Sequence, residues 1–325
     1  MGDLAPEGLA TLIARGRREA MAPLEAEHWL LERFGVARQR DWPAAPYCLL
    51  ADGRAAGIAP GEDCWMRADP VHLRAEGSGL LHVDASECAI TDEEAGMLAR
   101  DINRHFAGSF TLVAPRRDRW YLRLQEAPDM ETAPLAAVCG RSIASRLPRG
   151  AEAMRWQART NELQMLLHEH PVNAAREARG ELTVNSVWLW GAGRLAPPQA
   201  KSFRLAAAND PLALGLAQAA GAAAMPLPAG GGAWIESTRG AGSVLLVLDA
   251  LRPPVCRGDG RAWREQLGAL DRDWFGPLAL ALRRWRIGMV SLYLLGPERT
   301  LKVETTGSDL RRFWRRAKPL AAWGS

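Results

Sequence analysis

The segment Asn185-Ser186-Val187-Trp188-Leu189-Trp190-Gly191-Ala192-Gly193-Arg194 decides how the rest of the chain is interpreted. Trp188 and Trp190 are two residues apart, so on a strand both indoles point to the same face of the sheet. Gly191 and Gly193 admit backbone angles that other residues avoid, or let another group approach the backbone closely. The segment therefore predicts a strand that ends in a glycine turn with an arginine beyond it, which is where α/β proteins place ligands.

Beyond this segment, extended and helical patterns alternate along the chain. A strand at 184–190 is followed by alanine-rich helical sequence at 199–223, an apolar strand at 243–248, a long helix at about 261–286, and strands at 287–295 and 300–304. An apolar run of this kind suits a buried parallel strand. The alternation predicts a mainly parallel sheet with right-handed crossovers.

Between Cys64 and Leu124 the pattern changes to α+β. Short extended pieces are expected at 64–67, 80–83, 110–113 and 120–124. A helix should begin at Thr91, with Thr91 as N-cap and Glu94 three residues later, which is the capping-box pattern.

A proline- and glycine-rich connection follows at 125–150, and then an amphipathic helix at 152–168. Its buried side is expected to carry Met154, Leu163, Leu166 and Leu167. We therefore divide the chain into a first part of an α/β core at 1–60, an inserted α+β domain at 61–150 and a second part of the core at 151–325.

The composition limits the class of protein. The 325 residues are 48% hydrophobic and 24% charged, as in ordinary soluble globular proteins. No apolar run approaches the roughly 18 residues that span a bilayer, and the segment Met1–Glu7 lacks the basic start and apolar run of a secretion signal. These features predict a cytoplasmic protein without a membrane partner.

The five cysteines lie far apart, and none forms a Cys-x-x-Cys pair, which argues against a zinc knuckle or a thioredoxin-like site. An odd number of cysteines suits a reducing compartment, where they act as small apolar residues. The net charge is a modest +4. The basic cluster of Arg311, Arg312, Arg315 and Arg316 is interpreted as the solvated surface of a C-terminal helix, and nucleic acid is not an expected partner.

Three short motifs follow one another along the chain, and both their residues and their order are informative. Gly61-Glu62-Asp63-Cys64-Trp65-Met66-Arg67-Ala68-Asp69 comes first, His170-Pro171-Val172-Asn173-Ala174-Ala175-Arg176 second, and Asn-x-x-Trp-x-Trp-Gly-x-Gly at 185–193 last. Together they resemble the archaeal type of cofactor-independent phosphoglycerate mutase, a branch of the alkaline-phosphatase superfamily, over residues 20–225. Residues 65–73 with 185–193 look closer still to a family of uncharacterised bacterial phosphoglycerate-mutase-like proteins, sometimes labelled regulators of pathogenicity factors.

The resemblance implies an alkaline-phosphatase-like, mainly parallel core that lacks its N-terminal part and carries an inserted α+β lid domain. Mutases of that superfamily hold two divalent metals with clustered Asp and His and pass the phosphoryl group through a serine. The first serine of this chain is Ser78, and no histidine follows His170. The departures favour a non-catalytic relative, a pseudoenzyme in a regulatory role, for which no cofactor is predicted.

A cleft between core and lid would then bind a small anionic metabolite or a protein partner. The residues expected to line it are Arg67, Asp69, Asn173, Arg176, Asn185, Trp190, Gly191, Gly193 and Arg194. Guanidinium groups match phosphate in a two-pronged way. Simpler roles stay open: an ion pair for Arg67 with Asp69, a helix cap for Asn173, and core packing for Trp188 and Trp190. His168 and His170 are not expected to bind a metal, because residues two apart do not share a helix face.

Two other functions remain open at this point. A metal-dependent mutase or phosphatase with a rebuilt site would use Asp249, Asp259 and Glu25 to hold Mg²⁺ or Mn²⁺. A protein–protein module would instead use a tryptophan-rich face, with a homodimer as one outcome. Convergence of Arg67, Arg176 and Arg194 on one cleft favours the anion site, and their dispersal favours a scaffold.

Overall fold

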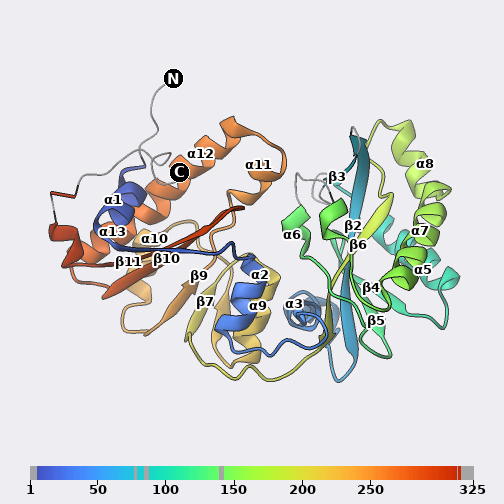
Figure 1. The fold of residues 1–325 in the computed structure, drawn as a ribbon, viewed down its shortest axis with the longest axis horizontal. Coiled ribbons are helices and arrows are strands. Elements are labelled where there is room, and N and C mark those ends of the chain that lie inside the picture. Colours follow the sequence, from blue (N-terminus) through green and yellow to red (C-terminus); the bar gives the residue numbers. More distant parts are fainter. Residues whose placement is uncertain (1–5, 77–78, 84–87, 139–142, 313, 316–325) are drawn as a thin grey trace.

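The computed structural model describes residues 6–76, 79–83, 88–138, 143–312 and 314–315, and over these residues the strands form three sheets. Figure 1 shows two lobes with α2, α3 and α9 between them. One lobe is built on a five-stranded antiparallel sheet and the other on a three-stranded antiparallel sheet, while a small parallel sheet lies beside α9. The architecture is therefore α/β with mixed sheets.

The five-stranded sheet is centred on one long strand. Its strands are β2 (Cys64–Glu76), β3 (Gly79–Val83), β4 (Thr111–Arg116), β5 (Arg119–Leu124) and β6 (Ser186–Arg194). Strand β2 pairs with β3, β5 and β6, always antiparallel. All four extended pieces expected between residues 64 and 124 are confirmed.

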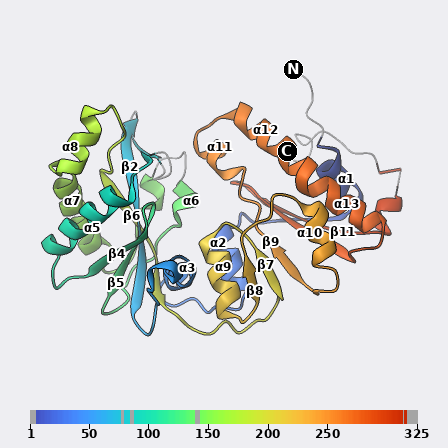
Figure 2. The ribbon, with the colours of Figure 1, turned by 180° about the vertical axis from the view of Figure 1, so that it is seen from behind.

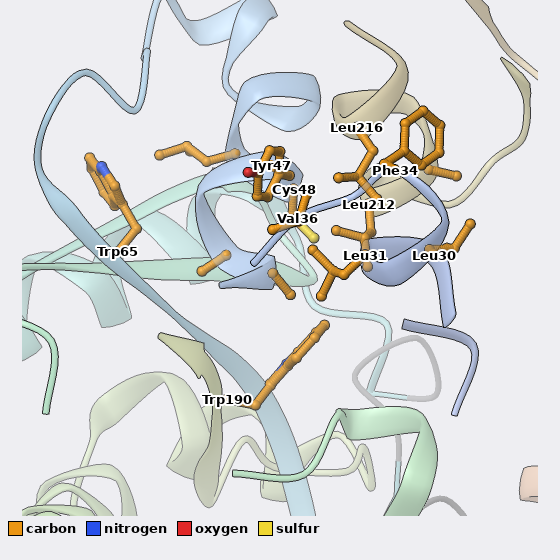
Figure 3. Close-up of a cluster of buried hydrophobic side chains, with 14 of the residues drawn as sticks. Leu30, Leu31, Phe34, Val36, Tyr47, Cys48, Trp65, Trp190, Leu212 and Leu216 are labelled. Carbon is orange, nitrogen blue, oxygen red and sulfur yellow. The ribbon is translucent and has the colours of Figure 1, made fainter. Parts of the chain in front are cut away.

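Both faces of this sheet are covered, and alternate residues belong to different cores. Leu189 and Ala192 face the core formed with α5 (Asp92–His105), α7 (Ala153–His168) and α8 (Pro171–Ala178), whereas Trp188 and Trp190 face α3 (Ala44–Asp52). Figure 2 shows α5, α7 and α8 on the opposite side of the sheet from α3. Figure 3 shows Trp190 in one cluster with Tyr47 and Cys48 of α3. The shared face predicted for the two tryptophans is confirmed.

Helix α7 packs on this sheet. Trp156, Leu163 and Leu167 of α7 lie in the same core as residues of β2 and β5. The domain boundary expected at residue 150 stays a prediction. Between β5 and α7, the described residues form the short helix α6 (Leu135–Val138), a 3₁₀ turn at Ala144–Arg146 and an isolated β-bridge between Glu131 and Arg149.

Local signals in this lobe have mixed outcomes. The capping box is confirmed, with Thr91 Oγ1 accepting from Glu94 N at 3.1 Å and Glu94 Oε2 accepting from Thr91 N at 2.9 Å. Helix α7 is also confirmed, but Met154 is 81% exposed. That assignment was wrong because Trp156 sets the inner face, and a residue two positions away lies on the opposite side of a helix.

The predicted glycine turn is wrong, because β6 continues through Gly193 to Arg194. Arg67 pairs with Trp190 and Trp65 with Gly193, so two residues of β6 lie opposite Met66 alone. This is a β-bulge. Gly191 takes φ +71° there, and a Cβ at this position would lie 3.0 Å from the Cβ of Ala44. Glycine is thus required by the bulge and by the approach of α3.

The parallel sheet has the order β8 (Ala223–Met225), β7 (Leu205–Ala207), β9 (Val244–Leu246). Strand β9 confirms the buried parallel strand expected at 243–248. Helix α9 (Pro211–Ala219) joins β7 to β8 and packs against α3 and α2 (Ala26–Arg33).

The third sheet is antiparallel, with β1 (Arg17–Met21), β11 (Thr300–Thr306) and β10 (Met289–Leu295) in that order. The expectation of a mainly parallel sheet fails here. Only residues 296–299 connect β10 to β11, and so short a connection permits a hairpin but no parallel crossover.

Helices α1 (Glu7–Arg15) and α13 (Gly276–Arg283) pack against this sheet. Helix α10 (Gly231–Ser237) packs against α13, and α11 (Arg252–Cys256) packs against α12 (Gly260–Leu270). The long helix expected at 261–286 is α12 and α13, joined by a π-helical turn at Asp271–Phe275. The Asp271 carboxylate accepts from Gly8 N at 3.1 Å and Leu9 N at 2.7 Å, which fixes the first turn of α1. The basic C-terminal helix is represented by a 3₁₀ turn at Asp309–Arg311, and Arg316 lies outside the described residues, as does Ser78.

Cysteine usage differs from the expectation. Cys48, Cys64 and Cys88 are free and buried, and burial raises the pKa of the Cys64 thiol to about 11. Cys256, however, is disulfide-bonded, so it does not act as a free apolar residue, and Cys139 lies outside the described residues. Within the described part of the chain, the structure has no helix of the length and apolarity needed to cross a membrane.

We predict that Gly191→Ala destabilises the protein more than Gly221→Ala. Both glycines have φ +71°, but a Cβ at Gly221 meets nothing within 4 Å, whereas at Gly191 it meets Ala44. The left-handed conformation costs a non-glycine residue about 1–2 kcal/mol, and crowding at a packed site adds about 1–3 kcal/mol. Urea unfolding measures the difference, and equal losses in the two variants would refute the packing role of Gly191.

Candidate functional site

Arg67 and Asp69 form a buried ion pair on β2. Arg67 Nε and Nη2 both donate to Asp69 Oδ1, and Trp190 Nε1 donates to Asp69 Oδ2 at 2.7 Å. The guanidinium lies over the rings of Tyr121 and Trp190, at 5.0 and 5.3 Å. Burial has the largest single effect and would lower the pKa of Arg67, but the Asp69 carboxylate, with smaller contributions from Tyr121, Cys48 and Asp52, holds the pKa above its ordinary value.

This pair continues into a network beneath α3. Tyr121 Oη donates to Asp52 Oδ2 at 2.7 Å, and Arg119 forks onto the same carboxylate at 2.7 and 2.9 Å. Arg67 is only 4% exposed. The geometry is that of an ion pair joining β2, β5 and β6 to the end of α3, and an external anion has no access to Arg67.

Arg176 and Asn173 lie in α8 on the other face of the sheet. Arg176 donates to Glu94 Oε2 at 2.7 Å, to Leu182 O at 2.8 Å and to Cys88 O. Asn173 binds Leu167 O, Val184 O and Val184 N, all within 3.0 Å. Both side chains thus hold the chain on either side of α8 in place.

The cap expected of Asn173 belongs to His170. Pro171 begins α8, so His170 is the N-cap and accepts from Val172 N at 3.2 Å. Its other ring nitrogen lies 3.1 Å from Asp101 Oδ2. Asn173 is inside the helix and points inward, whereas His168 is exposed in the last turn of α7.

Arg194 and Asn185 bind backbone at opposite ends of β6. Arg194 Nη2 donates to Gln125 O at 2.8 Å and Nη1 to Glu62 O. The Asn185 amide pairs with both backbone groups of Leu73, at 2.7 and 2.9 Å. A Cβ on Gly193 would lie 2.5 Å from Pro43 Cβ. Arg67, Arg176 and Arg194 share no partner, and this dispersal favours the scaffold interpretation of the motifs.

Charged side chains converge instead at the carboxyl ends of the parallel strands. Asp210 follows β7 and Asp249 follows β9, while Arg252 begins α11 and Glu27 lies in the first turn of α2. We call Glu27, Asp210, Asp249 and Arg252 the carboxylate cluster. The carboxyl edge of parallel strands is the usual place for a site in such sheets.

The guanidinium is at the electrostatic centre of the cluster. Arg252 Nη2 lies 2.8 Å from Glu27 Oε1. Glu27, with help from Asp210 and Asp249, outweighs the effect of burial and raises the pKa of Arg252. Burial raises the pKa of Asp210 despite the opposing attraction of Arg252, and Glu27 and Asp249 raise it further.

Close to the carboxylate cluster, the Thr132 hydroxyl joins Asp41 to Gly191, and we call these three residues the Thr132 clamp. The Thr132 hydroxyl donates to the buried Asp41 carboxylate and accepts from Gly191 N at 3.0 Å. Burial raises the pKa of Asp41, and its hydrogen bond with Thr132 lowers it in part. The small hollow here, between Glu27, His28 and Trp190, leaves no room for a water molecule. We assign this clamp a structural role.

Sequence reasoning identified only Asp249 in the carboxylate cluster. Asp210 carried a usable signal, because an aspartate directly before Pro211 marks the start of a helix, and here it follows a strand. Its side chain indeed caps α9 by accepting from Ala213 N at 2.9 Å. Glu27, Arg252 and Asp41 have no motif around them, and only the fold brings them to this region.

The described residues do not fit the metal site of a rebuilt enzyme. Asp259 caps α12 by accepting from Arg261 N and Ala262 N at 3.0 and 2.9 Å, and Glu25 pairs with Arg146 at 2.7 Å. In the part of the chain that the structure describes, no group of three or more His, Cys, Asp or Glu residues could hold a metal ion.

Comparison with known sequences places part of this chain near the mutases. It is 36% identical over 74 residues to a probable 2,3-bisphosphoglycerate-independent phosphoglycerate mutase of Geobacter sulfurreducens, 31% over 110 residues to the mutase of Methanothrix thermoacetophila, and 27% over 158 residues to that of Methanosarcina barkeri. These matches cover 23, 34 and 47% of this chain and 18, 28 and 39% of the relatives. They show distant homology to cofactor-independent phosphoglycerate mutases, and no family model matches the chain.

Two solved structures align with most of the chain at low sequence identity. The PH0037 protein of Pyrococcus horikoshii is 12% identical with a TM-score of 0.51, over 93% of this chain and 80% of that one. The cofactor-independent phosphoglycerate mutase of Thermoplasma acidophilum is 18% identical with a TM-score of 0.41, over 92% and 81%. The first of these shows a similar fold.

We predict that Asp210→Asn stabilises the protein increasingly as the pH rises. The folded-state pKa of Asp210 is raised above its ordinary value of 3.8, so wild-type stability is lost as the pH rises through that folded pKa. Asparagine keeps the cap on α9 but carries no charge. Urea unfolding should show that the free energy of unfolding of the variant, relative to that of wild type, is larger at pH 7 than at pH 4. Asp259→Asn, the same change at an exposed cap, is the control, and an unchanged difference for Asp210→Asn would contradict the expectation.

Proposed function

We propose that this protein is a non-catalytic relative of the cofactor-independent phosphoglycerate mutases that acts in regulation, by binding a small anionic metabolite or a protein partner. The proposal is supported mainly by one observation, the Arg252 guanidinium among Glu27, Asp210 and Asp249. Distant homology to the mutases supports the relationship.

The argument from Arg252 is one of charge. Phosphoryl transfer by the resembled mutases needs divalent cations that neutralise developing charge and activate the nucleophile. At the carboxyl edge of the parallel sheet, the Arg252 guanidinium already supplies a positive charge to the carboxylates, and it is paired with Glu27 at 2.8 Å. A metal ion would have to break that pair and would be repelled by the guanidinium.

The hydroxyl and thiol groups of this region are buried or paired. Helix α3 carries Tyr47, whose hydroxyl donates to Ala196 O at 2.6 Å, and Cys48, whose side chain is buried. The Thr132 hydroxyl is held by Asp41 and Gly191, and the hollow around it has no room for water. A nucleophile must reach its substrate, and Thr132 in this arrangement cannot.

The motif arginines suit a structural role more than an anion site. Arg67, Arg176 and Arg194 all bind internal partners that fix strands and loops. In this proposal an anionic metabolite therefore binds elsewhere on the protein, and the motifs hold the strands and loops in place.

Arg252→Ala tests the role of the guanidinium. Removing it leaves the buried Glu27 without its partner, and we expect a loss of about 1–3 kcal/mol, below the usual value for a buried pair because Arg252 is partly exposed. Adding Mn²⁺ should raise the melting temperature of neither wild type nor the variant, because the described His, Cys, Asp and Glu residues form no group of three or more that could hold a metal ion.

Arg146→Ala is the matched control, because it removes the partner of Glu25 at 2.7 Å outside the cluster, and Mn²⁺ should have no effect on it. Mutase and phosphatase assays on wild type should show no turnover. Stoichiometric Mn²⁺ or Zn²⁺ on wild type, together with turnover, would overturn the proposal.

A further inference from the structure

An arginine-lined hollow opens on the sheet formed by β1, β11 and β10, in the lobe that does not contain the five-stranded sheet (Figure 1). Its volume is about 500 Å³. The charged residues that line it are Arg17, Arg18, Glu304, Asp309, Arg312 and Arg315. We call it the arginine hollow; it shares no lining residue with the carboxylate cluster.

The pairing of the strands explains why this face is open. Arg17 pairs with Glu304, and the next pair is Arg18 with Val303, which is fully buried. Since neighbouring residues point to opposite faces, Arg17 and Glu304 point away from the core. Met289, opposite Thr306 on the far strand, is 56% exposed and adds an apolar wall.

The two acidic side chains of the hollow are already compensated. Lys302 Nζ lies 2.9 Å from Glu304 and lowers the pKa of that carboxyl. Asp309 accepts from the backbone and hydroxyl of Thr306 at 3.0 and 2.7 Å and pairs with Arg312 at 3.1 Å. Burial would raise the pKa of Asp309, but these bonds lower it overall.

The lining residues are positive overall. Four arginines against two carboxylates give them a net charge of +2, and the nearby Lys302 is balanced by Glu19, 3.6 Å away. The contact of Arg315 with Gly16 O is long, at 3.5 Å, so its other donors stay available. Arg17 interacts with Glu304 only at longer range.

We propose that the arginine hollow binds a small phosphorylated ligand, with Arg17 and Arg315 as its main contacts. Guanidinium groups bind phosphate through parallel hydrogen bonds, and the volume lies in the range of small-molecule sites. A hollow of about 500 Å³ has room for a compact anion and not for an extended phosphodiester backbone, which favours a small phosphorylated molecule over nucleic acid. The site goes beyond the proposed regulatory role, because it stands whether or not the carboxylate cluster is catalytic.

Titration calorimetry with inorganic pyrophosphate at low salt tests the proposal, because exposed charges are screened at high ionic strength. Wild type should bind, and Arg17→Ala with Arg315→Ala should weaken the affinity at least about 10-fold, the loss expected for one charged hydrogen bond. The control pair Arg261→Ala with Arg264→Ala, on the exposed surface of α12, should bind like wild type.

The double variant Arg17→Lys with Arg315→Lys keeps both positive charges but cannot form the paired hydrogen bonds of a guanidinium, so it should bind with intermediate affinity. This variant preserves the test if the double alanine variant does not fold. The proposal is overturned if wild type does not bind pyrophosphate, or if the alanine pair binds it as well as wild type does. Tighter, Arg17-dependent binding of a single-stranded oligonucleotide would also overturn it, by identifying a nucleic-acid surface.

Discussion

The buried ion pair of Arg67 and Asp69 is the interaction on which the five-stranded sheet depends. Removing two charges from water is costly, and further contacts of both side chains offset this cost. Trp190 donates a hydrogen bond to the Asp69 carboxylate, the Tyr121 hydroxyl accepts one from Arg67, and the rings of both residues lie against the guanidinium. Its partners lie on β2, β5 and β6, so the network forms only when all three strands are in register. It therefore specifies the pairing of segments that lie far apart in the sequence.

The carboxylate cluster uses the same physical solution at the centre of the molecule. There too an arginine lies among carboxylates, but Arg252 is partly exposed and its partners come from α2, α9 and the segment after β9. At the carboxyl edge of the parallel sheet, the positive charge of Arg252 thus balances part of the negative charge of the three carboxylates.

Local rules predicted the parts of this fold that depend on local physics. The two-residue spacing of Trp188 and Trp190 gave their common face, and Thr91 with Glu94 gave the start of α5. The bulge at Gly191 could not be predicted from the sequence. A positive φ favours glycine both in a β-bulge and in a turn, so the presence of glycine does not distinguish the two. The carboxylate cluster joins residues 27, 210, 249 and 252, and no spacing in the sequence encodes their convergence.

Strand β11 connects the arginine hollow to the centre of the molecule. Glu304 and Thr306 line the hollow at one end of this strand, while at the other end the Thr300 hydroxyl accepts from Leu24 N at 3.2 Å, just before α2. On the neighbouring β10, Tyr293 contacts the ring of Trp29 in α2 at 4.6 Å. Helix α2 carries Glu27, the partner of Arg252. An anion bound in the arginine hollow would therefore contact the same sheet that positions α2. The proposed ligand site and the carboxylate cluster thus belong to one packed unit.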